Sequence, residues 1–308
     1  MEEYVHISVQ KEKSINYLNI KKNGIYFDCT FGRGGHSLEI LKKLDNTGLL
    51  ISIDKDLDAF LYYKDFFPKY SNHIFVNDSF SNLKDILEKL SISKVDGFIF
   101  DFGVSSPMFD NPKRGFSYRF DSRLDMRMDQ NQKLDAYWII NNYSVADLTK
   151  IFKNYGNVKN AYAISKYIDK ARKIKPIVTT FDFLEIIKKS ISKKEMYSNK
   201  SFANKYFQAI RIEVNNEMEE IEKGIKTALN FLNTKGRIVT ISFHSLEEKI
   251  IKKAFLSTKN EILPKEIPIN NIKNEYRIIN VKNRWANNEE IETNSRAHSS
   301  LLKVIERE

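Results

Sequence analysis

Short apolar runs of strand length recur at similar intervals along the first hundred residues, and each is followed by a segment with helical spacing. The runs lie at 25–29, 49–53, 73–76 and 95–100. Three of them end on or beside an acid, namely Asp28, Asp54 and Asp101. Strands that alternate with helices build a parallel sheet, whose ligands bind beyond the carboxyl ends of the strands. The pattern therefore predicts an α/β fold with three carboxylates at one edge of a sheet.

The middle of the chain has a different pattern, because its apolar spacing is helical and no strand-like run interrupts it. Predicted helices lie at 134–140, from Ser144 onward, at 161–171 and at 181–191. Strand-like runs return at 237–243 and 301–305, and a long loop is expected between them at 258–298. One helix with apolar positions from Val214 to Leu232, closed by Gly236, leads back into the sheet. We expect a sheet domain made of 1–107 and 208–308, with an all-helical domain inserted at 108–207.

A glycine-rich loop follows the first predicted strand and carries Gly32, Gly34 and Gly35, then His36 and Ser37. Glycine accepts positive φ and lets a ligand approach the backbone. A strand, a glycine loop and a helix are typical of a nucleotide site, but Ser37 stands where a dinucleotide loop has its third glycine. An acid at the strand tip suits a ligand with an amino group better than a pyrophosphate. The loop thus favours S-adenosylmethionine, and a tight turn that binds nothing is the alternative.

Three further side chains follow predicted strands at positions where they would meet this ligand. Asp54 lies 22 residues beyond Gly32, near the offset at which a carboxylate accepts from both ribose hydroxyls, with an N-cap as the alternative role. Phe80 is expected to lie against an adenine or in the core. Asp101 is expected to face the donated methyl group and to accept a hydrogen bond either from the ligand or from an incoming amino group, with a helix cap as its alternative role.

Composition narrows the class of partner and compartment. The 308 residues carry a net charge of +10, which favours a polyanion such as nucleic acid, although an AT-rich genome would also enrich lysine. The single Cys29 excludes an intramolecular disulfide, and five scattered histidines show no metal-ligand spacing. We find no signal pattern and no apolar run of the ~20 residues that a membrane span needs. We expect a cytoplasmic protein without a metal or a membrane contact, and the sequence leaves open whether it is a homodimer.

Cations and aromatic rings are interleaved in the segment that follows the fourth predicted strand. They are Arg114, Arg119, Arg123 and Arg127 with Phe116, Tyr118 and Phe120. This mixture suits a phosphate backbone and unstacked bases. Pairing of the arginines with nearby aspartates is an equally good interpretation.

The run Ser242-Phe-His-Ser245 invites a hydrolase interpretation, which we reject. The chain has no nucleophile elbow of the G-x-S-x-G type. Ser245 with Glu247 and Glu248 is instead interpreted as a capping box that opens a helix.

Five segments, in this order along nearly the whole chain, resemble one known family. They are Asp28-Cys-Thr-Phe-Gly-Arg-Gly-Gly-His-Ser37, Asp101-Phe-Gly-Val-Ser-Ser-Pro107, Arg114-Gly-Phe-Ser117 with Leu124-Asp-Met-Arg-Met-Asp129, Phe207-Gln-Ala-Ile-Arg-Ile-Glu-Val-Asn215 and Ile241-Ser-Phe-His-Ser-Leu-Glu247. The Leu-Asp-Met-Arg-Met-Asp and Ser-Phe-His-Ser-Leu-Glu strings are distinctive. The chain resembles the ribosomal RNA small subunit methyltransferase H family, also called MraW.

The resemblance implies a Rossmann-like class I methyltransferase sheet with a helical insert, and S-adenosylmethionine as methyl donor. It further implies N4-methylation of a cytidine in the decoding region of 16S rRNA, within the small ribosomal subunit. The positions that match the family's cofactor contacts are Gly34, Gly35, His36, Asp54, Phe80, Asp101 and Met108. Asp101 is the residue that we expect to be catalytic.

Some positions depart from the family pattern. Position 108 is usually Gln, so Met108 loses a side-chain amide, and the Gly-Pro usual before Leu124 is Ser122-Arg123. The alternatives are another RNA or DNA amino-methyltransferase and a non-catalytic RNA-binding assembly factor. The chain lacks the Asn/Asp-Pro-Pro-Tyr string expected of the DNA enzyme, whereas Met108 is the best argument for the assembly factor.

Overall fold

The computed structural model describes residues 8–198, 201–257 and 275–308. They fall into two compact units, which we call the sheet unit (Met1–Gly103 with Met218–Glu308) and the helical unit (Val104–Glu217). The helical unit is longer than the stretch 108–207 because α11 (Asn204–Asn215) packs on α7 (Val145–Gly156) inside it. None of the helices in the described ranges is long and apolar enough to cross a bilayer.

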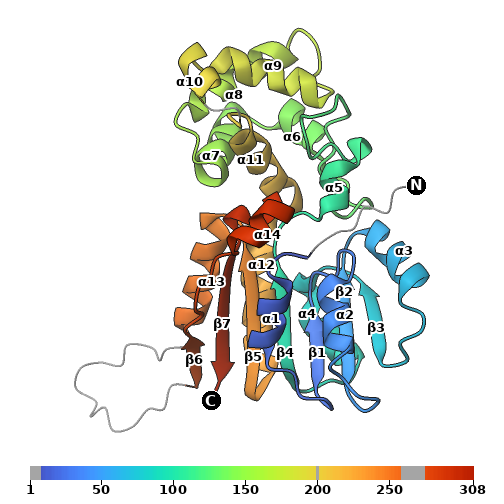
Figure 1. Cartoon of the computed structure of the whole chain (residues 1–308). Coiled ribbons are helices and arrows are strands. Elements are labelled where there is room, and N and C mark those ends of the chain that lie inside the picture. Colours follow the sequence, from blue (N-terminus) through green and yellow to red (C-terminus); the bar gives the residue numbers. More distant parts are fainter. Residues whose placement is uncertain (1–7, 199–200, 258–274) are drawn as a thin grey trace, which may run out of the picture. The chain divides into compact units, whose positions relative to one another are not determined.

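The sheet unit is built on one seven-stranded sheet with the order β3-β2-β1-β4-β5-β7-β6 (Figure 1). Strands β1 to β5 run parallel to one another, and β7 runs antiparallel to both β5 and β6. Their bounds are β1 (Ile25–Asp28), β2 (Leu49–Asp54), β3 (His73–Asn77), β4 (Val95–Asp101), β5 (Leu232–Ser242), β6 (Tyr276–Ile279) and β7 (Leu301–Arg307). The predicted α/β fold is confirmed, and Asp28, Asp54 and Asp101 lie at the carboxyl ends of adjacent parallel strands.

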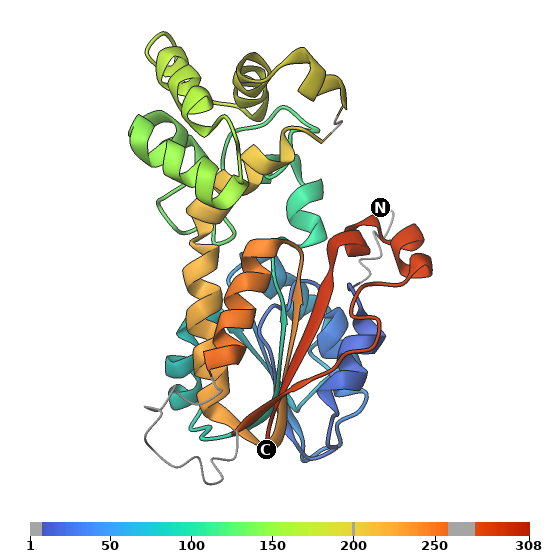
Figure 2. The ribbon, with the colours of Figure 1, turned by 90° about the vertical axis from the view of Figure 1, so that its left-hand side faces the viewer.

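Helices cover both faces of this sheet (Figures 1 and 2). One face packs against α1 (Lys11–Leu18), α2 (Gly35–Leu41) and α3 (Leu57–Phe66), and the other against α4 (Leu83–Lys89), α12 (Glu217–Phe231) and α13 (Ser245–Ser257). Side chains alternate along a strand, so Tyr26 joins the first core and Phe27 the second. Both are fully buried, as expected for a parallel strand covered on both faces.

The helical unit has a core of its own, built around Phe152, Phe183 and Tyr206. Its remaining helices are α5 (Ser106–Asp110), α6 (Ala136–Asn142), α8 (Ala161–Arg172), α9 (Thr180–Ser190) and α10 (Lys193–Ser198). The Ser144 hydroxyl accepts from the backbone N–H of Asp147 at 3.1 Å, which confirms the predicted cap of α7.

Two sequence predictions about the return to the sheet are wrong. The apolar spacing from Val214 to Leu232 does not form one helix, because Asn216 takes φ 48° as the C-cap of α11 and α12 starts afresh at Glu217. Asparagine tolerates this left-handed conformation, and apolar spacing does not reveal such a break. The helix also ends at Phe231, so Gly236 lies within β5 and does not close it.

The long loop predicted at 258–298 contains regular structure in its described part. Residues 275–298 include β6, the helix α14 (Asn288–Thr293) and most of the 3₁₀ turn Ser295–Ser299. The four-residue strand β6 pairs with β7 at the edge of the sheet and carries one charged residue, Arg277. Residues 258–274 lie outside the described ranges.

Candidate functional site

The glycine loop joins β1 to α2 and has the backbone geometry that its residues predict. Gly32 and Gly34 have φ angles of 55° and 70°, in the left-handed region that favours glycine. A Cβ atom on Gly34 would lie 2.4 Å from Cζ of Phe67, so this position also lacks space for a side chain. The Gly34 N–H donates to the carbonyl of Phe31 at 2.7 Å, which closes the turn directly before Gly35 and His36.

Asp28 forms the buried floor under this loop. Its Oδ2 accepts from the Ser37 hydroxyl at 2.6 Å, and its Oδ1 accepts from the Thr30 N–H at 3.2 Å. Burial raises the pKa of the Asp28 carboxyl to about 6, against the lowering effect of these hydrogen bonds. Because the side chain is only 1% exposed, Asp28 supports the loop from below and is not available to the amino group of a ligand.

Asp54 connects the tip of β2 to the glycine loop. Its Oδ2 accepts from the Gly32 N–H at 2.7 Å, and its Oδ1 accepts from the Asp56 N–H at 2.9 Å. The alternative N-cap role is wrong, since the cap of α3 is Asp56, whose side chain accepts from the Asp58 N–H. Asp54 is half-buried, and desolvation raises the pKa of its carboxyl to about 6.

Asp101 holds a buried acceptor oxygen that no described residue uses. Its Oδ1 is buried and has no hydrogen-bond partner among the described residues. Its backbone N–H donates to the Thr30 hydroxyl at 2.7 Å, which fixes the strand tip beside the glycine loop. The pKa of the Asp101 carboxyl is raised well above its ordinary value, by burial and then by the negative charges of Asp28, Glu247 and Glu290. Asp101 is not a helix cap, because α5 begins at Ser106 with Ser105 before it.

Phe80 and His36 are held by the protein itself. The Phe80 ring lies edge-on to Phe100 and Phe102, with centroids 5.7 and 5.9 Å away, and a Cβ on Gly224 would approach it to 2.7 Å. It is half-buried, so one part packs in the core and another part is accessible. The buried His36 ring lies with Nε2 3.2 Å from the carbonyl oxygen of Val9. An adenine contact by Phe80 and a cofactor contact by His36 stay predictions.

Met108 belongs to the helical unit and not to the sheet unit that carries the other six predicted cofactor residues. It lies in α5, and its side chain is buried in the core of the helical unit. A role of Met108 at the cofactor stays a prediction.

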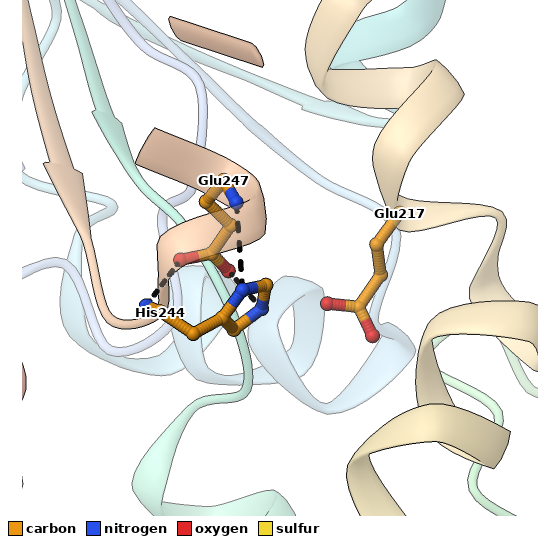
Figure 3. A group of neighbouring side chains, drawn as sticks. All are labelled: Glu217, His244 and Glu247. Carbon is orange, nitrogen blue, oxygen red and sulfur yellow. Dashed lines mark hydrogen bonds and ion pairs between the residues drawn. The ribbon is translucent and has the colours of Figure 1, made fainter. Parts of the chain in front are cut away.

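His244 and Glu247 form the start of α13, which corrects the predicted capping box (Figure 3). The helix begins at Ser245, and His244 Nδ1 accepts from the Glu247 N–H at 3.4 Å. In return, Glu247 Oε2 accepts from the N–H groups of Phe243 and His244 at 2.7 and 3.2 Å. The box therefore lies one residue earlier than predicted, because an imidazole nitrogen takes the acceptor role of a serine hydroxyl. Glu217, also drawn, belongs to the helical unit, where Arg211 donates to both of its carboxylate oxygens.

A buried polar chain beneath the loop is the feature that sequence reasoning missed. The Ser37 hydroxyl, which donates to Asp28, lies 2.8 Å from the Ser52 hydroxyl, and Ser52 lies 2.8 Å from Nε2 of His73. These residues come from α2, β2 and β3, so no local spacing links them. The one available signal was Ser37, a polar residue where a dinucleotide loop has glycine.

A family model described as the MraW methylase family matches residues 3–308. The chain belongs to the MraW methylase family. Three curated relatives of this MraW methylase carry the name "Ribosomal RNA small subunit methyltransferase H". That of Malacoplasma penetrans is 54% identical over 98% of this chain and 96% of its own length. Those of Ureaplasma parvum and Caldicellulosiruptor saccharolyticus are 49% and 46% identical, each over 99% of both chains.

Family membership confirms the predicted methyltransferase and S-adenosylmethionine as its methyl donor. The strand tips of this MraW methylase suit such a ligand. Glycines with positive φ form the loop, and Asp101 Oδ1 is a buried acceptor without a partner among the described residues. The carboxyls of Asp28, Asp54 and Asp101 have raised pKa values. A cation bound near them would stabilise their ionised forms. S-adenosylmethionine carries two positive groups, the sulfonium and the amino group.

Proposed function

We propose that this MraW methylase transfers a methyl group from S-adenosylmethionine to the exocyclic N4 of a cytidine in the decoding region of 16S rRNA, within the small ribosomal subunit. The observation that carries the catalytic part is the unpartnered Oδ1 of Asp101 at the tip of β4. The acceptor RNA is supported by the relatives, which are named for the ribosomal RNA of the small subunit. The net charge of +10 agrees with a polyanionic substrate.

The electrostatics of the strand tips favour a cationic donor over a phosphate-bearing one. Asp28, Asp54 and Asp101 all have raised pKa values, and burial is the largest cause of each shift. A bound positive charge lowers the pKa of such carboxyls and offsets part of the desolvation cost. A pyrophosphate would add negative charge to the same site. The negative charge at these strand tips therefore favours a sulfonium compound over a pyrophosphate.

Catalysis in this proposal needs one acceptor and accurate placement. The donor supplies a methyl group that is already activated by the sulfonium. The N4 amino group of cytosine is a poor nucleophile, because its lone pair is conjugated with the ring. Asp101 Oδ1 accepts a hydrogen bond from the amino N–H and thereby orients the lone pair toward the methyl carbon. The N–C bond forms as the S–C bond breaks, S-adenosylhomocysteine leaves, and the amino group releases one proton, which Asp101 accepts or passes to water. Placement of this kind contributes about 7–11 kcal/mol.

The other predicted residues have supporting roles. In our proposal Asp54 accepts from the ribose hydroxyls through lone pairs that Gly32 and Asp56 do not use, and Gly34, Gly35 and His36 border the methionine part. The accessible side of Phe80 lies against the adenine. Met108 offers a van der Waals contact in place of the usual amide. We place the reaction in the cytoplasm.

The test is methyl transfer to purified acceptors. Purified protein is incubated with S-adenosylmethionine labelled in the methyl group and with small subunits that lack the modification, free 16S rRNA or duplex DNA. We expect label in the rRNA of the small subunits. Label in duplex DNA alone would instead identify a DNA amino-methyltransferase. Absence of transfer to any acceptor, with calorimetry showing no binding of S-adenosylmethionine at millimolar concentration, would identify a non-catalytic RNA-binding protein.

A further inference from the structure

The positive charge of the chain is concentrated in the helical unit. Residues 104–217 contain 21 Lys and Arg against 12 Asp and Glu, a net charge of +9 out of the +10 of the whole chain. A unit of this charge attracts a polyanion over its own surface. The question is which part of the surface could also contact bases.

The four arginines of the interleaved segment divide into two structural classes. Arg114 is buried and donates through Nη2 to the carbonyls of Arg127 and Met128, both at 3.0 Å. Arg127 pairs with Asp125 at 2.7 Å and donates to two further backbone carbonyls. Both therefore hold the fold together. Arg119 and Arg123 also pair with aspartates, but their side chains stay 56% and 49% exposed.

Backbone hydrogen bonds gather three separate segments around Arg123. The Leu124 N–H donates to the carbonyl of Val178 at 2.9 Å, and the Thr180 N–H donates to the carbonyl of Ser122 at 2.8 Å, on either side of a β-bridge between Arg123 and Thr179. The start of α6 joins them, since the Tyr137 N–H donates to the carbonyl of Leu124 at 2.8 Å. Residues 120–124, 178–181 and the start of α6 thus form one platform.

This platform presents aromatic rings to solvent beside the arginines. Trp138 is 54% exposed, Phe120 43% and Phe181 41%. The Arg119 guanidinium lies 5.8 Å from the centroid of the Phe120 ring, and that of Arg123 lies 5.2 Å from the Tyr137 centroid. Exposed rings of this size cost solubility when they have no partner. Rings interleaved with guanidinium planes are the surface on which unstacked bases pack.

We propose that Phe120, Arg123, Trp138 and Phe181 form an RNA-binding patch that stacks unpaired bases of the substrate rRNA and pairs with its backbone. This patch lies on the helical unit and shares no residue with the set that we assign to the methyl donor. The inference rests on the proposed function for the identity of the RNA, but it makes its own claim about binding. RNA is favoured over a protein partner because the surrounding unit has a net charge of +9.

The test measures binding and turnover on the full chain. The variant Trp138→Ala/Phe181→Ala removes two exposed rings without opening a cavity in the core. We expect the Kd for 16S rRNA and the KM for small subunits to rise about tenfold to a hundredfold, as expected for the loss of stacked bases. The Kd for S-adenosylmethionine should be unchanged. An unchanged affinity for rRNA would overturn the proposal.

A matched control separates this patch from exposed rings in general. Tyr162, on α8, is 61% exposed and has Lys166 5.6 Å from its ring centroid, but it is outside the platform. Tyr162→Ala should leave the affinity for rRNA within about twofold of wild type. An equal loss in Tyr162→Ala and in the double variant would contradict a localised patch.

Salt dependence tests Arg123 independently of the rings. Arg123→Ala should reduce the slope of log K against log salt by about one, because one phosphate contact is lost, whereas the double ring variant should keep the wild-type slope. If Arg123→Ala leaves the slope unchanged, Arg123 does not contact a phosphate and is not part of the patch. The same conclusion follows if the variant loses affinity only together with thermal stability, because Arg123 then has a structural role. If wild type binds rRNA through the patch but transfers no methyl group, the proposed function fails and the patch stands.

Discussion

The sheet unit, which is the longer of the two, and the helical unit differ in how their charges are distributed. The sheet unit has 29 Lys and Arg against 28 Asp and Glu, close to neutral, and concentrates buried acids at its strand tips. The helical unit has a net charge of +9, and its Arg119 and Arg123 side chains stay half-exposed. A methyl donor with a sulfonium needs negative groups, and an RNA acceptor needs positive ones. In our proposal the acids of the sheet unit bind the methyl donor and the helical unit binds the RNA, and four predictions test this division.

The largest effect is expected at the strand tip of β4. Asp101→Ala removes the unpartnered acceptor and should lower kcat by about 10²–10⁴-fold, the range for a positioned acid–base group. The affinity for rRNA should stay nearly unchanged, since the change lies in the sheet unit. Turnover with labelled donor and a filter-binding assay measure the two quantities. Equal loss of both would point to misfolding and not to a catalytic role.

The second prediction concerns the glycine loop. Gly34→Ala forces a side chain into φ 70° and against Phe67, so the free energy of unfolding should fall by about 1–3 kcal/mol from the backbone alone, and more from the clash. The affinity for S-adenosylmethionine should fall with it. Gly103→Ala is the matched control, because Gly103 has φ 99° but its Cβ would meet Phe243 only at 3.7 Å. Thermal melts of both variants should rank Gly34→Ala as less stable, and the reverse order would contradict the steric part.

The third prediction tests the buried polar chain under the loop. Ser37→Ala removes the donor to the buried carboxylate of Asp28 and should cost about 1.5–3 kcal/mol, the value for a hydrogen bond to a charged group. Ser52→Ala removes only the neutral link between Ser37 and His73 and should cost about 1 kcal/mol. Urea unfolding measures both. If Ser52→Ala were the more destabilising variant, the stability of these hydrogen-bonded side chains would depend on the link to His73 and not on the link to Asp28.

The smallest effect is a pH dependence of donor binding. The Asp54 carboxyl has a pKa of about 6, and its ionised form accepts from the ribose hydroxyls of the donor, so affinity is nearly full at pH 7 and falls as the pH drops through 6. The Kd for S-adenosylmethionine should be about tenfold weaker at pH 5 than at pH 7. Without the donor the sign reverses for stability. Ionisation of a carboxyl with a raised pKa costs free energy, so the free energy of unfolding should fall as pH rises from about 4 to 6.

Calorimetry of wild type and Asp54→Asn checks this prediction. The variant should have a flatter pH profile for donor binding, because the group that titrates is gone. The affinity for rRNA, which depends on arginines and rings, should follow neither profile. If Asp54→Asn keeps a steep pH dependence, a group other than Asp54 titrates, and Asp101 is the next candidate.

Regular, locally encoded features could be predicted from the sequence. Apolar runs that end at Asp28, Asp54 and Asp101 predicted a parallel sheet with these acids at one edge, although not the order of its strands. Features that depend on the conformation or the capping role of one residue could not be predicted from the sequence. Asn216 breaks a continuous apolar spacing by one backbone angle, and His244 replaces a serine as cap through a nitrogen lone pair. Long-range polar pairs such as Ser52 with His73 leave no spacing at all, because they meet only after the sheet has formed.

The interleaved arginines show the same limit. Sequence alone left Arg–Asp pairing and RNA contact equally open for all four. In the structure, Arg114 and Arg127 donate hydrogen bonds to backbone carbonyls and so stabilise the fold. The side chains of Arg119 and Arg123 stay half-exposed. The burial of each arginine side chain separates these two classes. That burial depends on segments far away in the sequence, such as 178–181, so the sequence alone does not reveal it.

Nucleoside analysis of the product tests the central claim most directly. Small subunits that lack the modification are incubated with S-adenosylmethionine and either wild type or Asp101→Ala, and their 16S rRNA is digested and mapped by mass spectrometry. We predict N4-methylcytidine at one position of the decoding region with wild type and none with Asp101→Ala. A methyl group on a different atom or base, or an equal yield from Asp101→Ala, would contradict the account.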